Sequence, residues 1–185
     1  MGRIVVSQFV TVDGVMEDPG GSEGMERGGW AFKFNRGEDG DKFKLDEVMD
    51  SSALLLGRKT YEGFAAAWPT REGDFADKLN TMPKYVVSST LSDPDWSNST
   101  VIATDDLAKL KDEEDGVILA NGSRRLVDEL VEQGLVDEFR LMVFPIVLGM
   151  GKQLFGDTSG TKSLALIESK PVGAEGVLVL VYRPK

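Results

Sequence analysis

The stretch GVILANGSRRLVDELVEQGLVDEFRLMVFPIVLGMGKQLF, residues 116 to 155, decides the fold of this chain. It opens with the short apolar run Val117 to Ala120, which has the length of a buried strand. Asn121-Gly122-Ser123 then breaks the strand, and Ser123 can cap a helix by accepting a hydrogen bond from a free backbone N–H. Apolar residues follow at helical spacing, and Phe139 to Leu148 predicts a second buried strand. The stretch therefore predicts a βαβ unit.

The turn at Gly122 is where ligand chemistry is expected. A helix N-terminus directly after a strand presents free N–H groups and a partial positive charge, so it can hold a phosphate without a basic side chain. Gly122 allows close approach to the backbone because it has no Cβ. The turn Asn121-Gly122-Ser123 also serves as a plain strand end and helix start, and on local grounds both interpretations have equal weight.

The composition of the 185-residue chain is that of an ordinary globular protein, with 41% hydrophobic residues and a net charge of −10. This length predicts a single domain over residues 1–185. The acidic balance disfavours a face that binds nucleic acid. No apolar run is long enough to span a bilayer and no signal peptide is visible, so we expect a cytoplasmic protein with no membrane contact.

The chain contains no His and no Cys. This excludes a thiol nucleophile, a Ser-His-Asp triad, and thiolate or imidazole metal ligands, so no metal site is expected. Any proton transfer must come from Asp, Glu, Lys, Tyr, water or a cofactor. The composition therefore favours chemistry carried by a bound cofactor, with the protein positioning the reactants.

The remainder of the chain alternates strands and helices. Strands are predicted over residues 3–10, 53–56, 83–87 and around 101, and helices over 38–50, 58–67, 74–80 and 105–111. Two last strands, over 163–169 and 176–182, predict an antiparallel hairpin. The expected fold is α/β, with a mainly parallel sheet, helices on both faces, and the C-terminal hairpin at one edge.

Several segments together resemble a known family. LLLGRKTYEGF (54–64), PKYVVSSTL (83–91) and ILANGSRRLVDEL (118–130) occur in the order and spacing of the dihydrofolate reductase fold. Two further stretches look more specifically like the C-terminal reductase domain of the bacterial riboflavin-biosynthesis deaminase/reductase: LVDEFRLMVFPIVLGMGKQLF (135–155), and TVDGVME after the first strand. The best match is the branch in which this domain stands alone as a single-domain protein. The resemblance covers nearly the whole chain and implies a dihydrofolate reductase-like fold.

The resemblance implies that NADPH lies across the C-terminal ends of the parallel strands. Gly57-Arg58-Lys59-Thr60 matches the phosphate turn, in which Arg58 would pair with the adenosine 2′-phosphate and Thr60 with the pyrophosphate. Ser88-Ser89 matches the loop beside the 2′-phosphate, and Asn121-Gly122-Ser123 matches the glycine turn on the other side of the pyrophosphate. Asp105-Asp106 stands where some reductases place a basic residue, which leaves the preference for NADPH over NADH open.

Two carboxylates are candidates for the catalytic proton. Dihydrofolate reductases carry a carboxylate on the helix before the phosphate turn, and counting back from Gly57 places it at Asp41. A carboxylate facing an apolar pocket has a raised pKa and can relay a proton. The alternative is a solvated helix face, shared with the neighbours Glu38, Asp39 and Asp46. Asp13, at the end of the first strand, is the second candidate, and its alternative is a plain Asp-Gly turn.

Residues 15–29 form a long loop rich in Gly and acidic residues, next to the expected nicotinamide site. In the dihydrofolate reductase fold the matching loop closes over the reacting ring. We therefore expect a lid that is mobile without ligand, with Met16, Met25 and Trp30 as its apolar contacts to the ligand or cleft wall. The alternative is a surface connection without a role in turnover.

The resemblance implies an NAD(P)H-dependent reductase that acts on a C=N or C=O bond of a heterocycle or ribosylamine. Reduction of 5-amino-6-(5-phosphoribosylamino)uracil in riboflavin biosynthesis is the first expectation, and dihydrofolate reduction is the second. A non-catalytic module that binds a nucleotide or pterin is the third. A homodimer is also expected, from the resemblance and from the apolar run Leu141 to Leu148, because Pro145 would place that strand at a bulge or a sheet edge.

Overall fold

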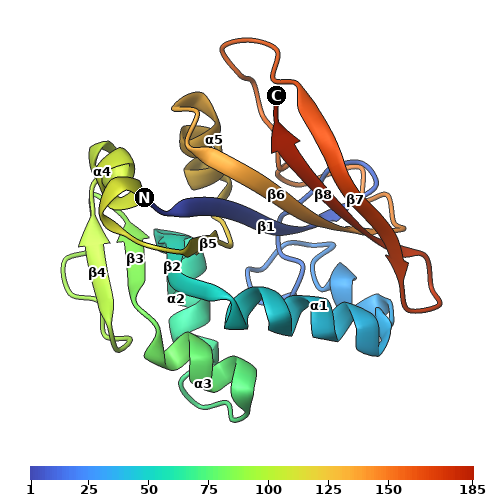
Figure 1. Cartoon of the computed structure of the whole chain (residues 1–185). Coiled ribbons are helices and arrows are strands. Elements are labelled where there is room, and N and C mark those ends of the chain that lie inside the picture. The colour runs from blue at the N-terminus through green and yellow to red at the C-terminus, as the bar shows by residue number, and fades with distance from the viewer.

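A computed structural model describes all 185 residues of the chain. Its centre is one eight-stranded sheet with the order β4-β3-β2-β5-β1-β6-β8-β7 (Figure 1). The strands are β1 (Arg3–Thr11), β2 (Ser51–Gly57), β3 (Lys84–Val87), β4 (Ser99–Ile102), β5 (Val117–Ala120), β6 (Val136–Phe144), β7 (Leu164–Val172) and β8 (Val177–Pro184). The strands from β4 to β6 in this order pair in parallel, and β8 pairs antiparallel with both β6 and β7. The predicted α/β fold with a C-terminal hairpin is confirmed.

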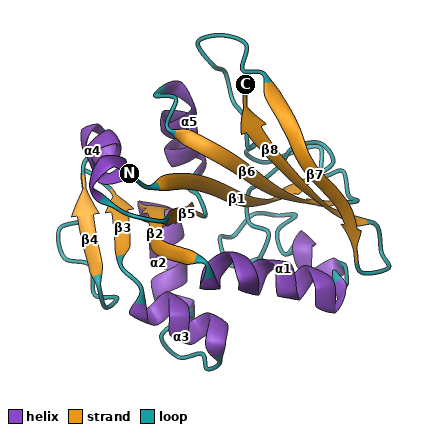
Figure 2. Cartoon of the chain, in the orientation of Figure 1, coloured by secondary structure: helices purple, strands orange, loops and turns teal.

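Helices cover both faces of this sheet (Figure 2). They are α1 (Gly37–Met49), α2 (Arg58–Ala67), α3 (Asp74–Thr81), α4 (Leu107–Glu113) and α5 (Arg124–Glu132), with the short 3-10 helices η1 (Trp30–Lys33) and η2 (Thr104–Asp106). Helices α4 and α5 bury Leu107 and Leu130 on one face, and α1 to α3 bury Val48, Tyr61 and Leu79 on the other. None of these helices has the length and apolarity needed to cross a membrane.

Strand β5 shows why its sequence is a continuous apolar run. Its side chains point alternately to the two faces, so Ile118 belongs to the core under α4 and α5, and Leu119 belongs to the core under α1 to α3. Both are fully buried. A parallel strand that is covered on both faces needs apolar residues at every position, and β5 meets this requirement.

The expected strand over Phe139 to Leu148 is partly wrong. Strand β6 ends at Phe144, directly before Pro145, because a proline has no N–H to donate to the ladder. This strand lies between β1 and β8, so it is not the exposed edge that the apolar run suggested. The edges of the sheet are β4 and β7. The apolar run Leu141 to Leu148 therefore gives no support to the expected dimer.

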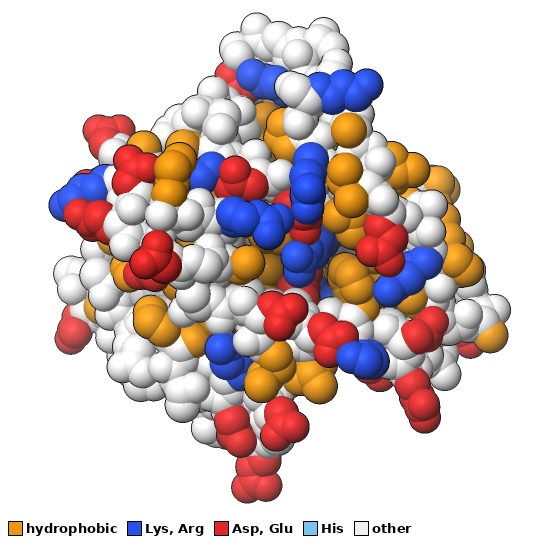
Figure 3. All heavy atoms as spheres, in the orientation of Figure 1, with side chains coloured by type: hydrophobic (Ala, Val, Ile, Leu, Met, Phe, Trp, Pro, Cys, Tyr) orange, Lys and Arg blue, Asp and Glu red, His pale blue; other side chains and the backbone are white.

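The buried side of α1 includes charged residues. Met49 is 48% exposed, whereas Lys44 and Glu47 are buried. These two side chains lie one helical turn apart and form an ion pair, and Lys44 Nζ also donates to Ser7 Oγ on β1 at 2.7 Å. A charged pair thus occupies part of the space between α1 and the sheet. Figure 3 shows Lys and Arg side chains gathered near the middle of this face of the molecule.

Candidate functional site

The turns that follow β2 and β5 meet at the C-terminal edge of the sheet. The Gly57 N–H donates to the Gly122 carbonyl at 2.9 Å. A Cβ on Gly57 would overlap the hydroxyl of Ser123, and a Cβ on Gly122 would lie 3.0 Å from Thr60 Oγ1. The first turns of α2 and α5 therefore begin side by side, at a contact that is tight enough to require glycine. The structure brings together Gly57, Thr60, Gly122 and Ser123, as the sequence predicted.

This arrangement suits a phosphate-containing ligand. Each helix N-terminus offers backbone N–H groups without helical partners and a partial positive charge. Here two of them begin side by side, and the position in front of both is called the gap below. Gly122 has a φ of +103°, a conformation that residues with a side chain rarely adopt. Ser123 is the N-cap of α5 as predicted, but its hydroxyl makes no capping hydrogen bond, so that part of the prediction is wrong. The hydroxyl remains able to bond a ligand.

Gln8 on β1 adds a polar group that the sequence analysis missed. The side chain is 7% exposed, and its Nε2 has no hydrogen-bond partner. This Nε2 and the Cε of Met16 both lie 3.6 Å from the point where a Cβ of Gly122 would be. A buried amide without a partner costs free energy, which a ligand oxygen in the gap would recover. The available signal was the polar pair Ser7-Gln8 inside an otherwise apolar strand.

The remaining predicted cofactor residues lie near the same edge of the sheet. Arg58 opens α2 and donates from Nη1 to Glu62 Oε1 at 2.8 Å, with its side chain 43% exposed. Lys59 is exposed beside it. Ser88 follows β3, the neighbour of β2, and its Oγ accepts from the N–H groups of Thr90 and Leu91. Ser89 is exposed in the same loop, and Asn121 is half-buried before Gly122.

Asp13 holds the segment after β6 in place. Its Oδ1 accepts from Thr11 Oγ1 at 2.6 Å and from the Leu148 N–H at 3.2 Å, and its Oδ2 accepts from the Gly149 N–H at 2.8 Å. The hydrogen bond from Thr11, with those from the two backbone N–H groups, lowers the pKa of Asp13 although partial burial opposes the shift. A lowered pKa opposes proton donation at neutral pH. The geometry supports the turn interpretation, and a catalytic role for Asp13 stays a prediction.

Asp41 lies on the solvent side of α1. Its side chain is 67% exposed, and its Oδ1 accepts from Arg36 Nε at 2.6 Å. The neighbouring carboxylates Glu38, Asp39 and Asp46 are exposed too. These positions match the solvated-face interpretation, and a catalytic role for Asp41 stays a prediction. The one buried carboxylate of this helix is Glu47.

The loop over residues 15–29 is anchored at several points. Asp18 is 1% exposed, and its carboxylate accepts from the N–H groups of Glu23 and Met25. Trp30 Nε1 donates to the Glu17 carbonyl at 2.9 Å, and Val15 forms an isolated bridge with Gln153. The loop is therefore organised around a buried carboxylate and joined to the segment that follows β6.

The three apolar contacts predicted for this loop have different surroundings. Met16 reaches the glycine turn at Gly122, as a lid residue would. Met25 packs beside Gly151, and Trp30 is fully buried with its ring 5.5 Å from that of Phe144 in an edge-to-face arrangement. Met16 is thus placed at the glycine turn, whereas Met25 and Trp30 fix the loop to the β6 side. Closure over a ligand stays a prediction.

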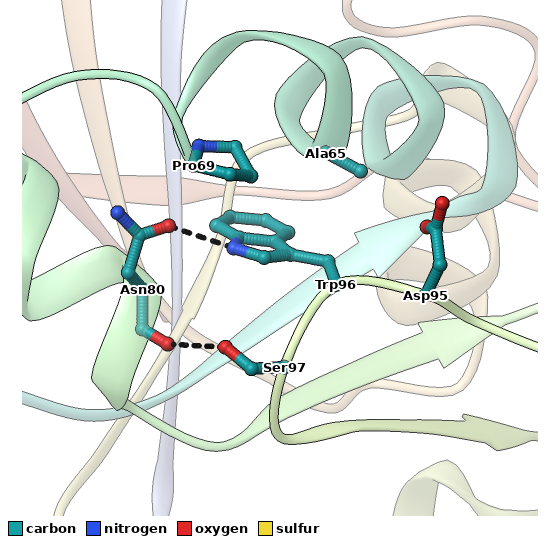
Figure 4. A pocket seen from close by; sticks show the side chains of 6 residues that line it. All are labelled: Ala65, Pro69, Asn80, Asp95, Trp96 and Ser97. Atoms are coloured by element: carbon teal, nitrogen blue, oxygen red, sulfur yellow. Dashed lines mark hydrogen bonds between the residues drawn. The ribbon is translucent and has the colours of Figure 1, made fainter.

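A separate cavity of about 530 Å³ lies beside α2 and α3, away from the glycine turns (Figure 4). Its lining residues are Ala65, Pro69, Asn80, Asp95, Trp96 and Ser97. Trp96 Nε1 donates to Asn80 Oδ1 at 2.8 Å, and Ser97 Oγ donates to the Asn80 carbonyl at 3.0 Å. These polar groups already have partners within the protein, so this cavity contributes nothing to the candidate site.

Comparison with known proteins decides the family. The family model of the RibD C-terminal domain matches residues 3–178. The chain belongs to this family. Two relatives from Bacillus subtilis (strain 168) are each 29% identical: the uncharacterized protein YyaP, over 97% of this chain and 94% of its own length, and the uncharacterized protein YwjB, over 92% of each. The two relatives are therefore similar to this chain over nearly their whole length.

Solved structures share the fold at low sequence identity. A protein of Shewanella sp. PV-4, provisionally assigned to riboflavin biosynthesis, has a TM-score of 0.77 and 20% identity, with 99% of each chain covered. A dihydrofolate reductase of Enterococcus faecalis, solved with NADP(H), has a TM-score of 0.60 and 14% identity, covering 99% of this chain and 96% of that one. The diaminohydroxyphosphoribosylaminopyrimidine deaminase/5-amino-6-(5-phosphoribosylamino)uracil reductase of Thermotoga maritima has a TM-score of 0.65 and 14% identity, and 57% of its chain is covered. The dihydrofolate reductase-like fold is confirmed.

The structural role of Asp13 generates a pH-dependent prediction. We expect Asp13→Asn to lower the free energy of unfolding at pH 7 by about 1 kcal/mol, a hydrogen-bond loss reduced by solvent screening. The pKa of Asp13 is lowered on folding, so its stabilisation is present above the ordinary carboxyl value of 3.8 and disappears as pH falls below it. Urea unfolding of both proteins from pH 7 to pH 3 measures this difference.

The matched control is Asp41→Asn, because Asp41 is exposed and has one ion-pair partner. We expect this variant to stay close to the parent at every pH. A difference between the parent and Asp13→Asn that persists unchanged at acid pH would contradict the role of the ionised Asp13 carboxylate.

Proposed function

We propose that this protein is an NADPH-dependent reductase that transfers hydride to a heterocyclic or ribosylamino-pyrimidine substrate of the 5-amino-6-(5-phosphoribosylamino)uracil type. The observation that carries the proposal is the meeting of two strand-to-helix turns at Gly57 and Gly122, beside the unpaired amide of Gln8. Reductases of this family bind NADP(H). The Thermotoga maritima enzyme, which has the same fold, is named for this uracil reduction.

The residues at the site fit such a cofactor. The N–H groups that open α2 and α5, with the Thr60 hydroxyl, would hold the pyrophosphate, and Arg58 would face the 2′-phosphate. The Gln8 amide would donate to a carbonyl oxygen in the gap, and Met16 would cover one side of it. When bound, the cofactor supplies the hydride. Asp13 and Asp41 are bonded elsewhere, to the backbone after β6 and to Arg36, so a water molecule at the open side of the gap would supply the proton.

A second candidate function is a binding module without turnover. It is favoured by the placement of Asp41 in solvent and by the ties of Asp13 to backbone N–H groups. The two candidates differ in one measurement, which is NADPH consumption with a panel of ribosylaminopyrimidines and pterins. Turnover of a ribosylaminopyrimidine supports the proposal, turnover of dihydrofolate supports the alternative reductase activity, and NADPH binding with no turnover on the panel supports the module.

Gln8 provides the sharpest test of the site. We expect Gln8→Leu to fold at least as stably as the parent, because it removes a buried amide without a partner. We also expect it to lose about tenfold in turnover or cofactor binding, the equivalent of one hydrogen bond. Thermal unfolding and NADPH oxidation, measured on the same samples, separate the two effects. Full activity in Gln8→Leu would show that the Gln8 amide does not contribute to the proposed site.

Arg58 tests the choice of cofactor. We expect Arg58→Ala to weaken NADPH binding by about 1–3 kcal/mol and NADH binding much less, because a charge-assisted hydrogen bond to the 2′-phosphate is lost. The matched control is Glu62→Gln, which removes the present partner of Arg58 and should leave NADPH binding unchanged or tighter. Calorimetric titration with both cofactors measures the change. Equal losses for NADPH and NADH would show that Arg58 does not read the 2′-phosphate.

We also propose that the protein is a homodimer joined through the β7–β8 hairpin. Leu166 and Leu178 lie on this hairpin and are 55% and 41% exposed. Leu166 is paired with Tyr182, which packs against the core under α5, so these residues continue an apolar face beyond the cover of that helix. An apolar face at the edge of a sheet calls for a partner, and a second copy supplies one by symmetry.

Light scattering at micromolar concentration should therefore give twice the monomer mass. Leu166→Glu should shift the protein toward the monomer, since a buried interface cannot hold an unpaired charge. Val147→Glu is the matched control, because Val147 is 68% exposed and lies outside the hairpin. This variant should have the same mass as the parent. A monomer mass for the parent would end the proposal.

A further inference from the structure

Asn121 is the one asparagine of the chain whose side chain makes no hydrogen bond. The chain has four asparagines. The side-chain amides of Asn35, Asn80 and Asn98 are each hydrogen-bonded within the protein, at 2.8 to 3.1 Å. Asn121 is half-buried in the turn between β5 and α5, and no hydrogen bond within the protein holds its amide in place.

The residue after Asn121 is Gly122, and an Asn-Gly pair occurs only here in the chain. In such a pair the backbone nitrogen of the glycine can attack the side-chain Cγ of the asparagine, because glycine has no Cβ to obstruct the approach. The Gly122 N–H lies outside every helix and strand and donates to no backbone carbonyl. The attacking nitrogen and the amide under attack are therefore both free of hydrogen bonds.

The surroundings of this turn favour the attack. The reaction passes through an anion, first on the Gly122 nitrogen and then on the side-chain oxygen of Asn121. The N-termini of α2 and α5, each with a partial positive charge, begin side by side at this point. Gln8 Nε2, which has no partner, and Thr60 Oγ1 lie 3.6 and 3.0 Å from the point where a Cβ of Gly122 would be. Donors and positive charge at a developing anion lower the barrier to its formation.

We propose that Asn121 is a site of spontaneous deamidation and that its products disable the proposed cofactor site. The Gly122 nitrogen loses its proton to water or hydroxide and bonds to Asn121 Cγ, the bond from Cγ to Nδ2 breaks, and ammonia leaves. The cyclic imide then takes up one water molecule. Opening at one imide bond gives aspartate at position 121, and opening at the other gives isoaspartate, in which the backbone runs through Cβ and Cγ.

Either product changes the turn on which the site depends. A carboxylate at position 121 lies next to the N–H groups that open α5, where it competes with a phosphate for these donors and repels it. Isoaspartate also lengthens the backbone by an atom, which displaces the Gly122 carbonyl from the Gly57 N–H that it meets at 2.9 Å. The loss of cofactor binding rests on the proposed function, whereas the deamidation itself does not.

Incubation of the full chain in warm, mildly alkaline buffer, followed by peptide mapping with mass spectrometry, tests the chemistry. We expect the Asn121 peptide to gain the mass of an NH₂-to-OH exchange and to divide into aspartate and isoaspartate forms. The peptides with Asn35, Asn80 and Asn98 should react at least about tenfold more slowly, since each amide must first break a hydrogen bond. An unmodified Asn121 peptide, or equal modification of the other three, would overturn the proposal.

Asn121→Gln is the control for the assignment. Its longer side chain would have to close a larger ring, which is slower, so we expect no mass gain in this peptide over the same period. Thermal unfolding confirms that the variant is folded before incubation. The same mass gain in Asn121→Gln and the parent would place the reaction at another residue and overturn the proposal.

NADPH separates the modification from the function of the site. We expect saturating NADPH to slow the reaction at Asn121, and Asn121→Asp to bind NADPH at least about tenfold more weakly than the parent, the equivalent of one hydrogen bond. Deamidation that is equally fast with NADPH bound, together with parent-like binding by Asn121→Asp, would overturn the effect on the cofactor site. No NADPH binding to the unmodified parent would contradict the proposed function, and the peptide map would still decide whether Asn121 is the modified residue.

Discussion

The hydrogen bond from the Gly57 N–H to the Gly122 carbonyl is the contact on which the rest of the site depends. It joins two turns that leave neighbouring parallel strands, and it is possible only because neither residue has a Cβ there. The contact sets α2 and α5 beside each other with their N-termini facing one gap. Without it, the N-termini of the same two helices would lie apart, and each could attract an anion only separately and weakly.

The elements that could be predicted from the sequence are those specified by local pattern. The apolar run of β5 and the glycine turn after it follow from periodicity and from the conformations that glycine allows, and the structure places them as expected. The elements that could not be predicted depend on partners distant in sequence. Lys44 and Glu47 look like a solvated helix face until Ser7 on β1 is placed opposite them.

Gln8 and Asp13 show the same limit within the candidate site. A glutamine in a strand carries no sign of whether its amide will find a partner, and the missing partner becomes visible only when Gly122 and Met16 surround it. Asp13 was placed correctly at a strand end, but its hydrogen bonds to Leu148 and Gly149 join positions more than a hundred residues apart. Composition and spacing cannot supply such contacts.

Asp13 also links the loop over residues 15–29 to the segment that follows β6. The carboxylate binds the backbone after β6, and its partner Thr11 accepts through the same hydroxyl from the Val15 N–H at 2.9 Å. Val15 is buried and directly precedes Met16, the loop residue that reaches Gly122. The start of the loop is thus held by a chain of hydrogen bonds that begins at the segment after β6. The position of Met16 beside the glycine turn is therefore fixed by polar contacts at the segment after β6, and any movement of the loop must occur beyond Met16 or break this chain of hydrogen bonds.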